Sequence, residues 1–218
     1  MNIYLIGGDP DYIFIRFQSV DEVSPLWDVK FKDTKLDPSH VVKLEYCFRE
    51  PEEDGVMTDC PNSGTGHTLV LSRRAVDALG PMLDAAGALV EIQPSHAMGY
   101  KTFICYRRID ALDAGRCLYM KTLSYIISRY EFKPDALEGA DIFRLQGQVG
   151  QLFVTDHFIG EVRKHRLSGF RYRRLWSSDT GGVLLDDPVM VFEQFPPGAG
   201  RTLREKRQIM RDMIASEH

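Results

Sequence analysis

The alternation of apolar and polar residues is clearest in residues 69–94, where it predicts a strand, a helix and a second strand. Residues 69–71 are a short apolar run typical of a buried strand. Ser72 follows at a helix N-cap position, where a side-chain oxygen accepts a bond from an otherwise unpaired backbone N–H group. Gly87 is expected to end the helix in the left-handed conformation, and residues 88–92 to form the second strand. The inward face of the helix has apolar residues at i, i+3 and i+7: Val76, Leu79 and Leu83.

The same order of elements recurs in residues 151–176. Residues 152–154 predict a strand, Thr155 the helix N-cap, and residues 167–169 the turn after the helix. Residues 170–175 alternate as a strand. The inward face of the helix is expected to carry Phe158, Ile159 and Val162. One face of the last strand is expected to carry Phe170, Tyr172 and Arg174.

Neither unit can bury its apolar face alone, so the two are expected to complete each other's core across one sheet. We therefore predict an α+β fold: a mixed sheet with two strand–helix–strand units packed together around a single core. Residues 1–68 are expected to form a β-rich N-terminal lobe of the same domain, and residues 69–218 the α+β core. A turn is expected at residues 7–10 and a C-terminal helix at residues 202–216. Further strands are expected at residues 2–6, 12–17, 41–48, 100–106, 121–133 and 142–145.

Composition is that of an ordinary globular protein. Of 218 residues, 44% are hydrophobic and 27% are charged, as in proteins that bury a core. The 27 Lys and Arg residues against 31 Asp and Glu residues give a formal net charge of −4. That charge is too small to indicate a nucleic-acid or membrane-surface protein as a whole. No apolar run approaches the roughly 20 residues that span a bilayer.

Cysteine usage indicates a reducing compartment. The four cysteines are Cys47, Cys60, Cys105 and Cys117. They form no CxxC pair and have no zinc-ligand histidines at the usual spacing. The first basic residue is Arg16, so the N-terminus lacks the basic start of a signal peptide. We therefore expect free thiols and a cytoplasmic protein.

No arrangement of residues in the sequence makes a convincing catalytic, cofactor or metal site. His157, Glu161 and His165 are spaced at i, i+4 and i+8, but a zinc site needs a further ligand, and a polar helix surface explains them equally well. The glycine-rich residues 64–67 precede a strand, whereas a phosphate-binding loop opens a helix. We predict that the protein is not an enzyme and holds no cofactor or metal. A small enzyme with an unrecognised site remains open.

A basic cluster at residues 163–174 supports an alternative function, that of a nucleic-acid-binding module. Its cations would hold phosphates while interleaved aromatic rings stack on bases. The simpler interpretation is that Arg171 and Arg173 form the solvent face of an alternating strand. The cluster comprises Arg163, Lys164, Arg166, Arg171, Arg173 and Arg174, with Tyr172 and Trp176 interleaved.

An acidic cluster lies in a long stretch that is rich in helix- and strand-breaking residues. Loops longer than about 12–15 residues are usually functional or disordered, and an acidic loop can steer a basic partner into place. A solvated run of charges is the other interpretation. The cluster comprises Glu50, Glu52, Glu53, Asp54 and Asp59; Asp9 and Asp11 are weaker candidates of the same kind.

The ordered series of segments resembles a family of bacterial immunity proteins from polymorphic-toxin and contact-dependent competition systems, the myxobacterial-type immunity domain. The likeness covers roughly residues 69–176. The segments that carry it are residues 69–79, 90–94, 100–106, 109–113, 142–145, 152–156 and 167–172.

The resemblance implies a non-enzymatic protein that binds and neutralises one cognate toxin, which is encoded beside it and delivered by a type VI secretion system. Toxins of such systems are often nucleases, whose active grooves are expected to be basic. The acidic cluster would then occupy such a groove as a phosphate mimic, in a 1:1 complex. An adaptor with several partners differs from this interpretation only in specificity.

Overall fold

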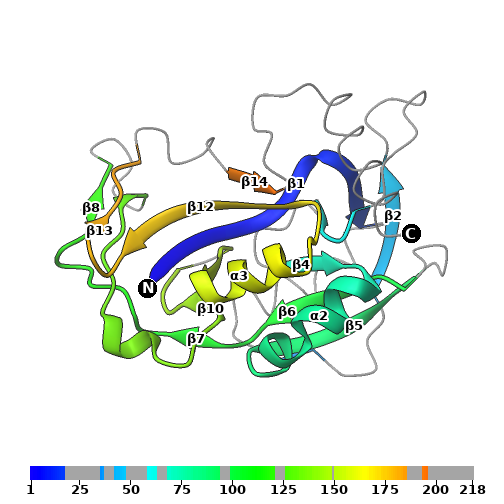
Figure 1. The fold of residues 1–218 in the computed structure, drawn as a ribbon, viewed down its shortest axis with the longest axis horizontal. Helices are drawn as coiled ribbons and strands as arrows, with labels where there is room; N and C mark the ends of the chain where they lie inside the picture. The colour runs from blue at the N-terminus through cyan, green and yellow to red at the C-terminus, as the bar shows by residue number, and fades with distance from the viewer. Residues whose placement is uncertain are drawn as a thin grey trace.

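The computed structural model describes residues 1–17, 35–36, 42–47, 58–62, 68–93, 99–120, 126–148, 150–185 and 193–195 (Figure 1). Within these ranges, the side chains of residues 9–17, 42–47, 93 and 193–195 are not described. The predicted C-terminal helix at residues 202–216 lies outside the described residues.

The described elements are two α-helices, one 3₁₀ helix and fourteen short or long strands. The helices are α2 (Arg73–Asp84), α3 (Asp156–Lys164) and the 3₁₀ helix η2 (Pro134–Leu137). The strands are β1 (Asn2–Phe17), β2 (Val42–Cys47), β3 (Pro61–Asn62), β4 (Thr68–Leu71), β5 (Gly87–Gln93), β6 (Lys101–Cys105), β7 (Arg108–Ile109), β8 (Leu118–Tyr119), β9 (Ile127–Arg129), β10 (Ile142–Leu145), β11 (Leu152–Thr155), β12 (Phe170–Ser177), β13 (Gly181–Gly182) and β14 (Glu193–Phe195).

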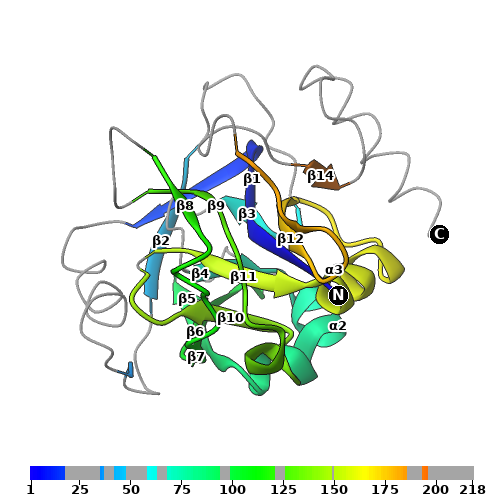
Figure 2. The same cartoon turned by 90° about the vertical axis from the view of Figure 1, so that its left-hand side faces the viewer.

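Twelve strands form one mixed sheet, and β8 and β9 form a separate two-stranded ribbon (Figure 2). The main path runs β4-β6-β5-β2-β1-β11-β10-β7, and β12 pairs with β1, β13 and β14. Most pairs are antiparallel, while β1 with β3, β2 with β5 and β7 with β10 are parallel. The predicted α+β class and mixed sheet are confirmed.

Both strand–helix–strand units are present where the sequence predicts them. The first is β4–α2–β5, and the second is β11–α3–β12. Their helices pack against each other on one side of the sheet (Figure 1). Of the predicted inward residues, Leu79, Leu83, Phe158 and Val162 are each 0% exposed and Ile159 is 1% exposed. Val76 is only half-buried, and its neighbour Ala75 is the fully buried residue of that turn. Within the described range, the strand predicted at residues 121–133 is reduced to the short β9.

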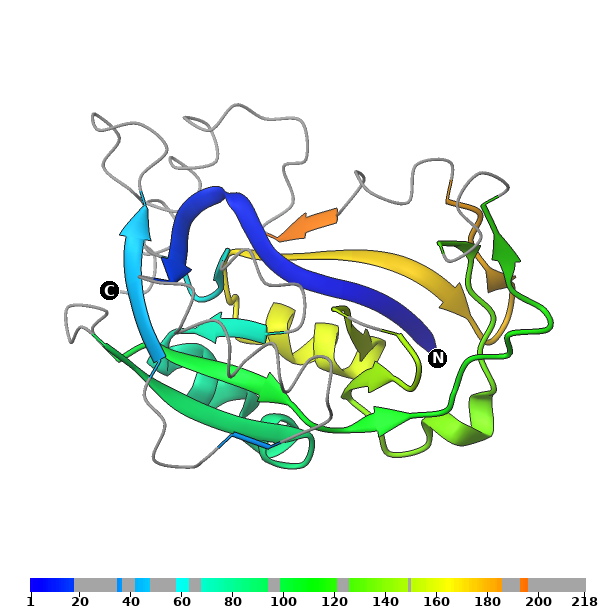
Figure 3. The same ribbon diagram turned by 180° about the vertical axis from the view of Figure 1, so that it is seen from behind.

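The predicted turn at residues 7–10 is wrong, because β1 continues through it as one long bent strand (Figure 3). Its first half lies between β11 and β12, where Ile3 pairs with both Thr155 and Trp176. Its second half pairs with β2. A Cβ atom on Gly8 would lie 2.6 Å from the Pro61 carbonyl oxygen, so glycine here permits the close approach of β3. The chain changes partners at this point and does not reverse.

The two faces of the central strands bury two different apolar clusters. On β11, Leu152 and Val154 face the cluster beneath α2 and α3, while Phe153 faces the opposite one. Strand periodicity of two residues produces this division. The second cluster is rich in aromatic rings, including the stacked pair Phe143 and Phe153. Residues 2–6 contribute to both clusters, so the start of the chain belongs to the core sheet.

Gly87 does not end α2 in the left-handed conformation. It is absent from the positive-φ residues, and the helix ends at Ala85, which is right-handed. Gly87 instead begins β5, where a Cβ atom would lie 2.0 Å from the Ile104 carbonyl oxygen. The prediction was therefore wrong about the cause: glycine is required for a close strand–strand approach and not for a helix cap.

Candidate functional site

The structure describes the acidic candidates only in part. Glu50, Glu52, Glu53 and Asp54 lie outside the described residues, and for Asp9 and Asp11 only the backbone, within β1, is described. The Asp59 side chain is described, and its surroundings differ from those expected of a residue exposed in a loop.

Asp59 lies in a buried polar cluster, with its side chain only 9% exposed. Its Oδ1 atom accepts a hydrogen bond from Ser72 Oγ at 2.7 Å and one from Arg74 Nε at 3.2 Å. Its Oδ2 atom accepts from Arg74 Nη2 at 2.7 Å, from the Ser168 N–H group at 2.8 Å and from Ser168 Oγ at 3.0 Å. One carboxylate thus joins the start of α2 to the turn after α3.

These bonds keep Asp59 ionised. Burial by itself raises the pKa of the carboxyl group, because it removes water from the charged form. The hydrogen bonds from Arg74, Ser168 and Ser72, together with the positive charge of Arg74, outweigh burial and lower the pKa below its ordinary value. The charge is therefore satisfied inside the protein, and we remove Asp59 from the candidate partner-binding residues.

Hydrogen bonds also hold the backbone at residues 58–60, a few residues after Glu50, Glu52, Glu53 and Asp54, which we call the acidic segment. The Tyr100 hydroxyl donates to the Thr58 carbonyl oxygen at 2.5 Å, and Cys60 N–H donates to the Ser168 carbonyl oxygen at 3.0 Å. Gly169 has φ +78°, and a Cβ atom there would lie 2.3 Å from Thr58 Oγ1. Along the chain, the acidic segment lies between β2, which ends at Cys47, and these bonded residues.

Sequence reasoning missed Arg74 and Ser168 as partners of Asp59. They are 15 and 109 residues away from it along the chain, so no local pattern connects them. It did identify Ser72 as the α2 N-cap, and Ser72 Oγ accepts from the Ala75 N–H group at 3.1 Å. The additional bond that Ser72 donates to Asp59 was not foreseeable from the helix alone.

The aromatic residues of the basic cluster are not available to stack on bases. Tyr172 is 3% exposed and Trp176 is 4% exposed. The Arg163 guanidinium lies over the Tyr172 ring, 5.3 Å from its centroid, and also donates to its hydroxyl oxygen. The Trp176 indole N–H group donates to Glu131 Oε2 at 3.2 Å. The nucleic-acid interpretation required both stacking rings and phosphate-binding cations, and of these two requirements only the cations are met.

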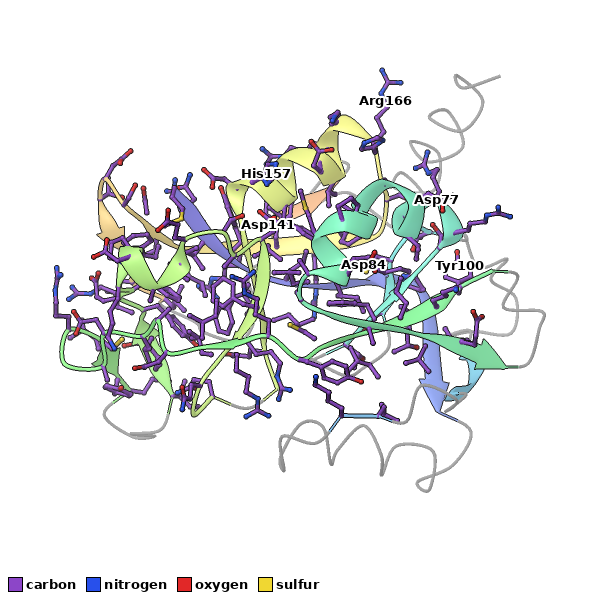
Figure 4. The ribbon with its side chains drawn as sticks, turned by 90° about the horizontal axis from the view of Figure 1, so that it is seen from below. Asp77, Asp84, Tyr100, Asp141, His157 and Arg166 are labelled. Atoms are coloured by element: carbon purple, nitrogen blue, oxygen red, sulfur yellow. The ribbon has the colours of Figure 1, made fainter. Side chains whose placement is uncertain are left out.

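The carboxylate and the histidines of α3 have polar partners on the helix surface. Glu161 accepts from Lys164 Nζ at 3.0 Å and lies 3.4 Å from His165 Nε2. The Lys164 hydrogen bond is the main cause that lowers the Glu161 pKa. His157 Nδ1 lies 2.8 Å from Asp141 Oδ1, and Figure 4 shows these two side chains facing each other. Within the described ranges, no group of three metal-ligating side chains comes together.

The cysteines whose side chains are described are buried. Cys60, Cys105 and Cys117 carry no disulfide. Burial raises the pKa of the Cys105 thiol to about 12 and raises that of Cys117 as well. Because the thiolate is the reactive form, neither group is activated for covalent chemistry at neutral pH.

The end of α3 combines a basic surface with an unusual backbone. Arg163, Lys164 and Arg166 lie there, and Arg74 Nη2 donates to the Arg166 carbonyl oxygen at 2.8 Å. Arg166 has φ +48°, and no other non-glycine residue in the described part of the chain has a positive φ. Its side chain is exposed and projects away from the ribbon (Figure 4). We call Arg73, Arg74, Arg163, Lys164 and Arg166 the basic corner.

None of the helices in the described part of the chain is long and apolar enough to cross a membrane. A comparison with curated proteins found no match. A comparison with protein families matched the immunity protein family Imm11 over residues 43–176. The match contains both strand–helix–strand units, the acidic segment and Asp59, and it covers more than half of the chain. The protein is therefore a member of the Imm11 immunity protein family, as the resemblance in its sequence implied.

Proposed function

We propose that this protein protects its own cell by binding one cognate antibacterial toxin directly and neutralising it in the cytoplasm, as a 1:1 complex without a cofactor. Membership of the immunity family carries this proposal. The toxin is proposed to be a type VI secretion effector with nuclease activity. Such an effector acts on a polyanion, so its active groove carries positive charge.

The acidic segment, Glu50, Glu52, Glu53 and Asp54, is the proposed contact with that groove. Four carboxylates within five residues offer a dense negative charge. Along the chain, the segment lies between β2 and the bonded residues 58–60. Flanks held by the fold reduce the conformational entropy that is lost when a segment is ordered on binding. Asp9 and Asp11 are proposed as secondary contacts.

Protection is tested by co-expression. The toxin domain encoded beside the gene of this protein is induced in cells with and without the chain. We expect growth to stop with the toxin alone and to resume when the chain is present. Continued killing at full expression of the folded chain would refute the proposed function.

The acidic contact is tested separately, by calorimetry with the purified toxin domain. Reversal of Glu50, Glu52, Glu53 and Asp54 to lysine is expected to weaken binding at least about 30-fold and to flatten its dependence on salt. The control reverses four exposed acids elsewhere, Asp84, Glu91, Asp135 and Glu138, and is expected to bind almost normally. Equal affinities of the two quadruple variants would refute the acidic contact without refuting immunity.

A further inference from the structure

The end of α3 has the hydrogen bonds of a Schellman cap. The Leu167 N–H group donates to the Val162 carbonyl oxygen at 3.0 Å, and the Arg166 N–H group donates to the Arg163 carbonyl oxygen at 3.0 Å. Leu167 and Val162 are both fully buried in the core beneath the helices. In this motif the residue in the left-handed position is usually glycine, because a Cβ atom is strained there. Here that residue is Arg166.

The fold itself gives no reason for arginine at this position. Three hydrogen bonds hold the chain here: Arg166 N–H donates to Arg163, Leu167 N–H donates to Val162, and the Arg166 carbonyl oxygen accepts from Arg74 Nη2. Residues 166 and 167 take part in them only through main-chain atoms, so glycine at position 166 would keep all three. The structure describes no hydrogen bond or ion pair for the Arg166 guanidinium within its described ranges, and the side chain is exposed. The favourable effect of cations on the helix dipole is already supplied by Arg163 and Lys164 in the last turn.

Backbone strain that the fold does not require is a pointer to function. The other members of the basic corner are engaged: Arg163 with Tyr172, Lys164 with Glu161, and Arg74 with Asp59. Arg73 lies 3.9 Å from Asp77. Within the described ranges, Arg166 is therefore the member of this corner whose guanidinium has no described partner, while Arg73, with its side chain 84% exposed, has only this long pair.

We propose that Arg166 is an anchor residue for the cognate toxin, and that it binds a carboxylate on an acidic part of the toxin surface. The inference rests on the proposed function and adds a second contact to it. A planar guanidinium can hold a carboxylate with two parallel hydrogen bonds, and arginine is enriched among the residues that dominate protein interfaces. The left-handed backbone and the Arg74 bond fix the point from which the side chain extends.

Arg166 is also connected to the core of the two units by a polar network. Asp59 is bonded to Arg74, and Arg74 is bonded to the Arg166 carbonyl oxygen. The network therefore fixes the backbone from which the Arg166 side chain extends. A preorganised anchor loses less conformational freedom on binding.

A protein partner is favoured over a nucleic acid by the surroundings of Arg166. Both aromatic rings of the basic cluster are buried, and Lys164 already shares its charge with Glu161. The corner therefore offers a guanidinium that extends from a fixed backbone position, but neither aromatic ring of the basic cluster can serve as a base-stacking platform. That combination suits recognition of a carboxylate on a folded surface.

The test compares Arg166→Gly, Arg166→Ala and Arg166→Glu with the matched change Arg174→Gly. Arg174 is an exposed arginine of the same sequence cluster, without a positive φ. Thermal unfolding of the purified chain is measured first. Because glycine relieves the strain, Arg166→Gly is expected to raise Tm by about 2–4 °C. Arg174→Gly is expected to lower Tm, since glycine weakens a strand.

Binding is then measured by calorimetry with the purified toxin domain encoded beside the gene. All three Arg166 variants are expected to bind at least about 30-fold more weakly, with Arg166→Glu the weakest, while Arg174→Gly stays within about threefold of the wild type. A variant that is more stable yet binds more weakly separates a binding residue from a structural one.

Three results would overturn the inference. If the wild type binds the toxin domain and the Arg166 variants bind equally well, the anchor is wrong while the immunity function stands. If Arg166→Gly lowers Tm, the arginine is explained by the fold. If the Arg166 variants lose retention on a duplex DNA column but keep their toxin affinity, the corner binds nucleic acid. A wild type that fails to bind the toxin domain refutes the proposed function itself.

Discussion

The two strand–helix–strand units are built from the same sequence of elements but end differently. The first, β4–α2–β5, leaves its helix at Ala85 and enters β5 at Gly87, where the neighbouring strand leaves no room for a side chain. The second, β11–α3–β12, leaves its helix through the strained Arg166 and turns at Gly169. The first ending is dictated by packing. The second contains one residue that packing does not require, and this residue lies on the surface proposed to bind the toxin.

The largest expected effect tests the packing of the first ending. Gly87→Ala places a Cβ atom about 2 Å from the Ile104 carbonyl oxygen and close to the Phe103 ring, so β5 and β6 must separate. We expect a loss of about 3 kcal/mol in the free energy of unfolding, at the upper end for overpacked sites, as measured by urea denaturation. A loss below 0.5 kcal/mol, the size of an ordinary surface substitution, would show that the strands are not in close contact at this point.

The next effect tests the network that joins the two units. Asp59→Asn removes the charge from a carboxylate that accepts five hydrogen bonds, three of them from Ser72 and Arg74. We expect a loss of about 2 kcal/mol at pH 7, since bonds to charged groups are worth more than neutral ones. Asp84→Asn, an exposed control at the last residue of α2, is expected to change stability by less than about 0.5 kcal/mol.

The pH dependence of that loss has a defined sign. Because the pKa of Asp59 is lowered in the folded protein, its contribution is complete above the pKa of the unfolded chain, which is about 4. It disappears as the pH falls through the folded-state pKa. The difference between wild type and Asp59→Asn should therefore be constant from pH 7 to pH 5 and shrink below pH 4. A difference that grows on acidification would contradict the assigned ion pair.

A smaller effect distinguishes the two helix N-caps. Ser72 Oγ accepts from the Ala75 N–H group and donates to Asp59, whereas Thr155 makes no side-chain cap bond and lies 3.5 Å from Asp141 Oδ1. Ser72→Ala is expected to lower the free energy of unfolding by about 1.5 kcal/mol, and Thr155→Ala by about 0.5 kcal/mol. Equal losses from both, measured by denaturant titration, would mean that the two caps are equivalent.

The smallest effect is a gain. Gly160 lies in the middle of α3, and a Cβ atom there would meet nothing within 4 Å. Gly160→Ala is expected to add about 0.5–1 kcal/mol to stability through helix propensity. The gain should appear as a shift of the denaturation midpoint with an unchanged slope. A loss would indicate that the α3 surface is more crowded than the structure shows.

Local patterns were sufficient to predict most of the secondary structure of the two units. Apolar spacing identified the inward residues Leu79, Leu83, Phe158 and Val162, and small polar residues marked both N-cap positions. These features depend on residues within one helical turn of each other, and a sequence displays such relationships directly. The family resemblance likewise followed from the order of these segments and is confirmed by the Imm11 match.

Features that depend on distant partners were not predictable in this way. The glycines at positions 7 and 8 indicated a turn, but four strands, β2, β3, β11 and β12, pair along β1 and carry it through as one strand. From the sequence alone, Asp59 is interpreted as one more acid of an exposed loop, because Ser168, which donates to it in the fold, lies 109 residues further along the chain. The positive φ of Arg166 has no signal in composition, because arginine is an ordinary residue near the end of a helix.

The central claim, that the chain neutralises a toxin by binding it, is tested most directly by titration of toxin activity. The purified toxin domain encoded beside the gene is held at fixed concentration while the chain is added in measured amounts. The account predicts that toxin activity falls in proportion to the added chain and reaches zero at one equivalent. Full toxin activity at a several-fold excess of folded chain would contradict it.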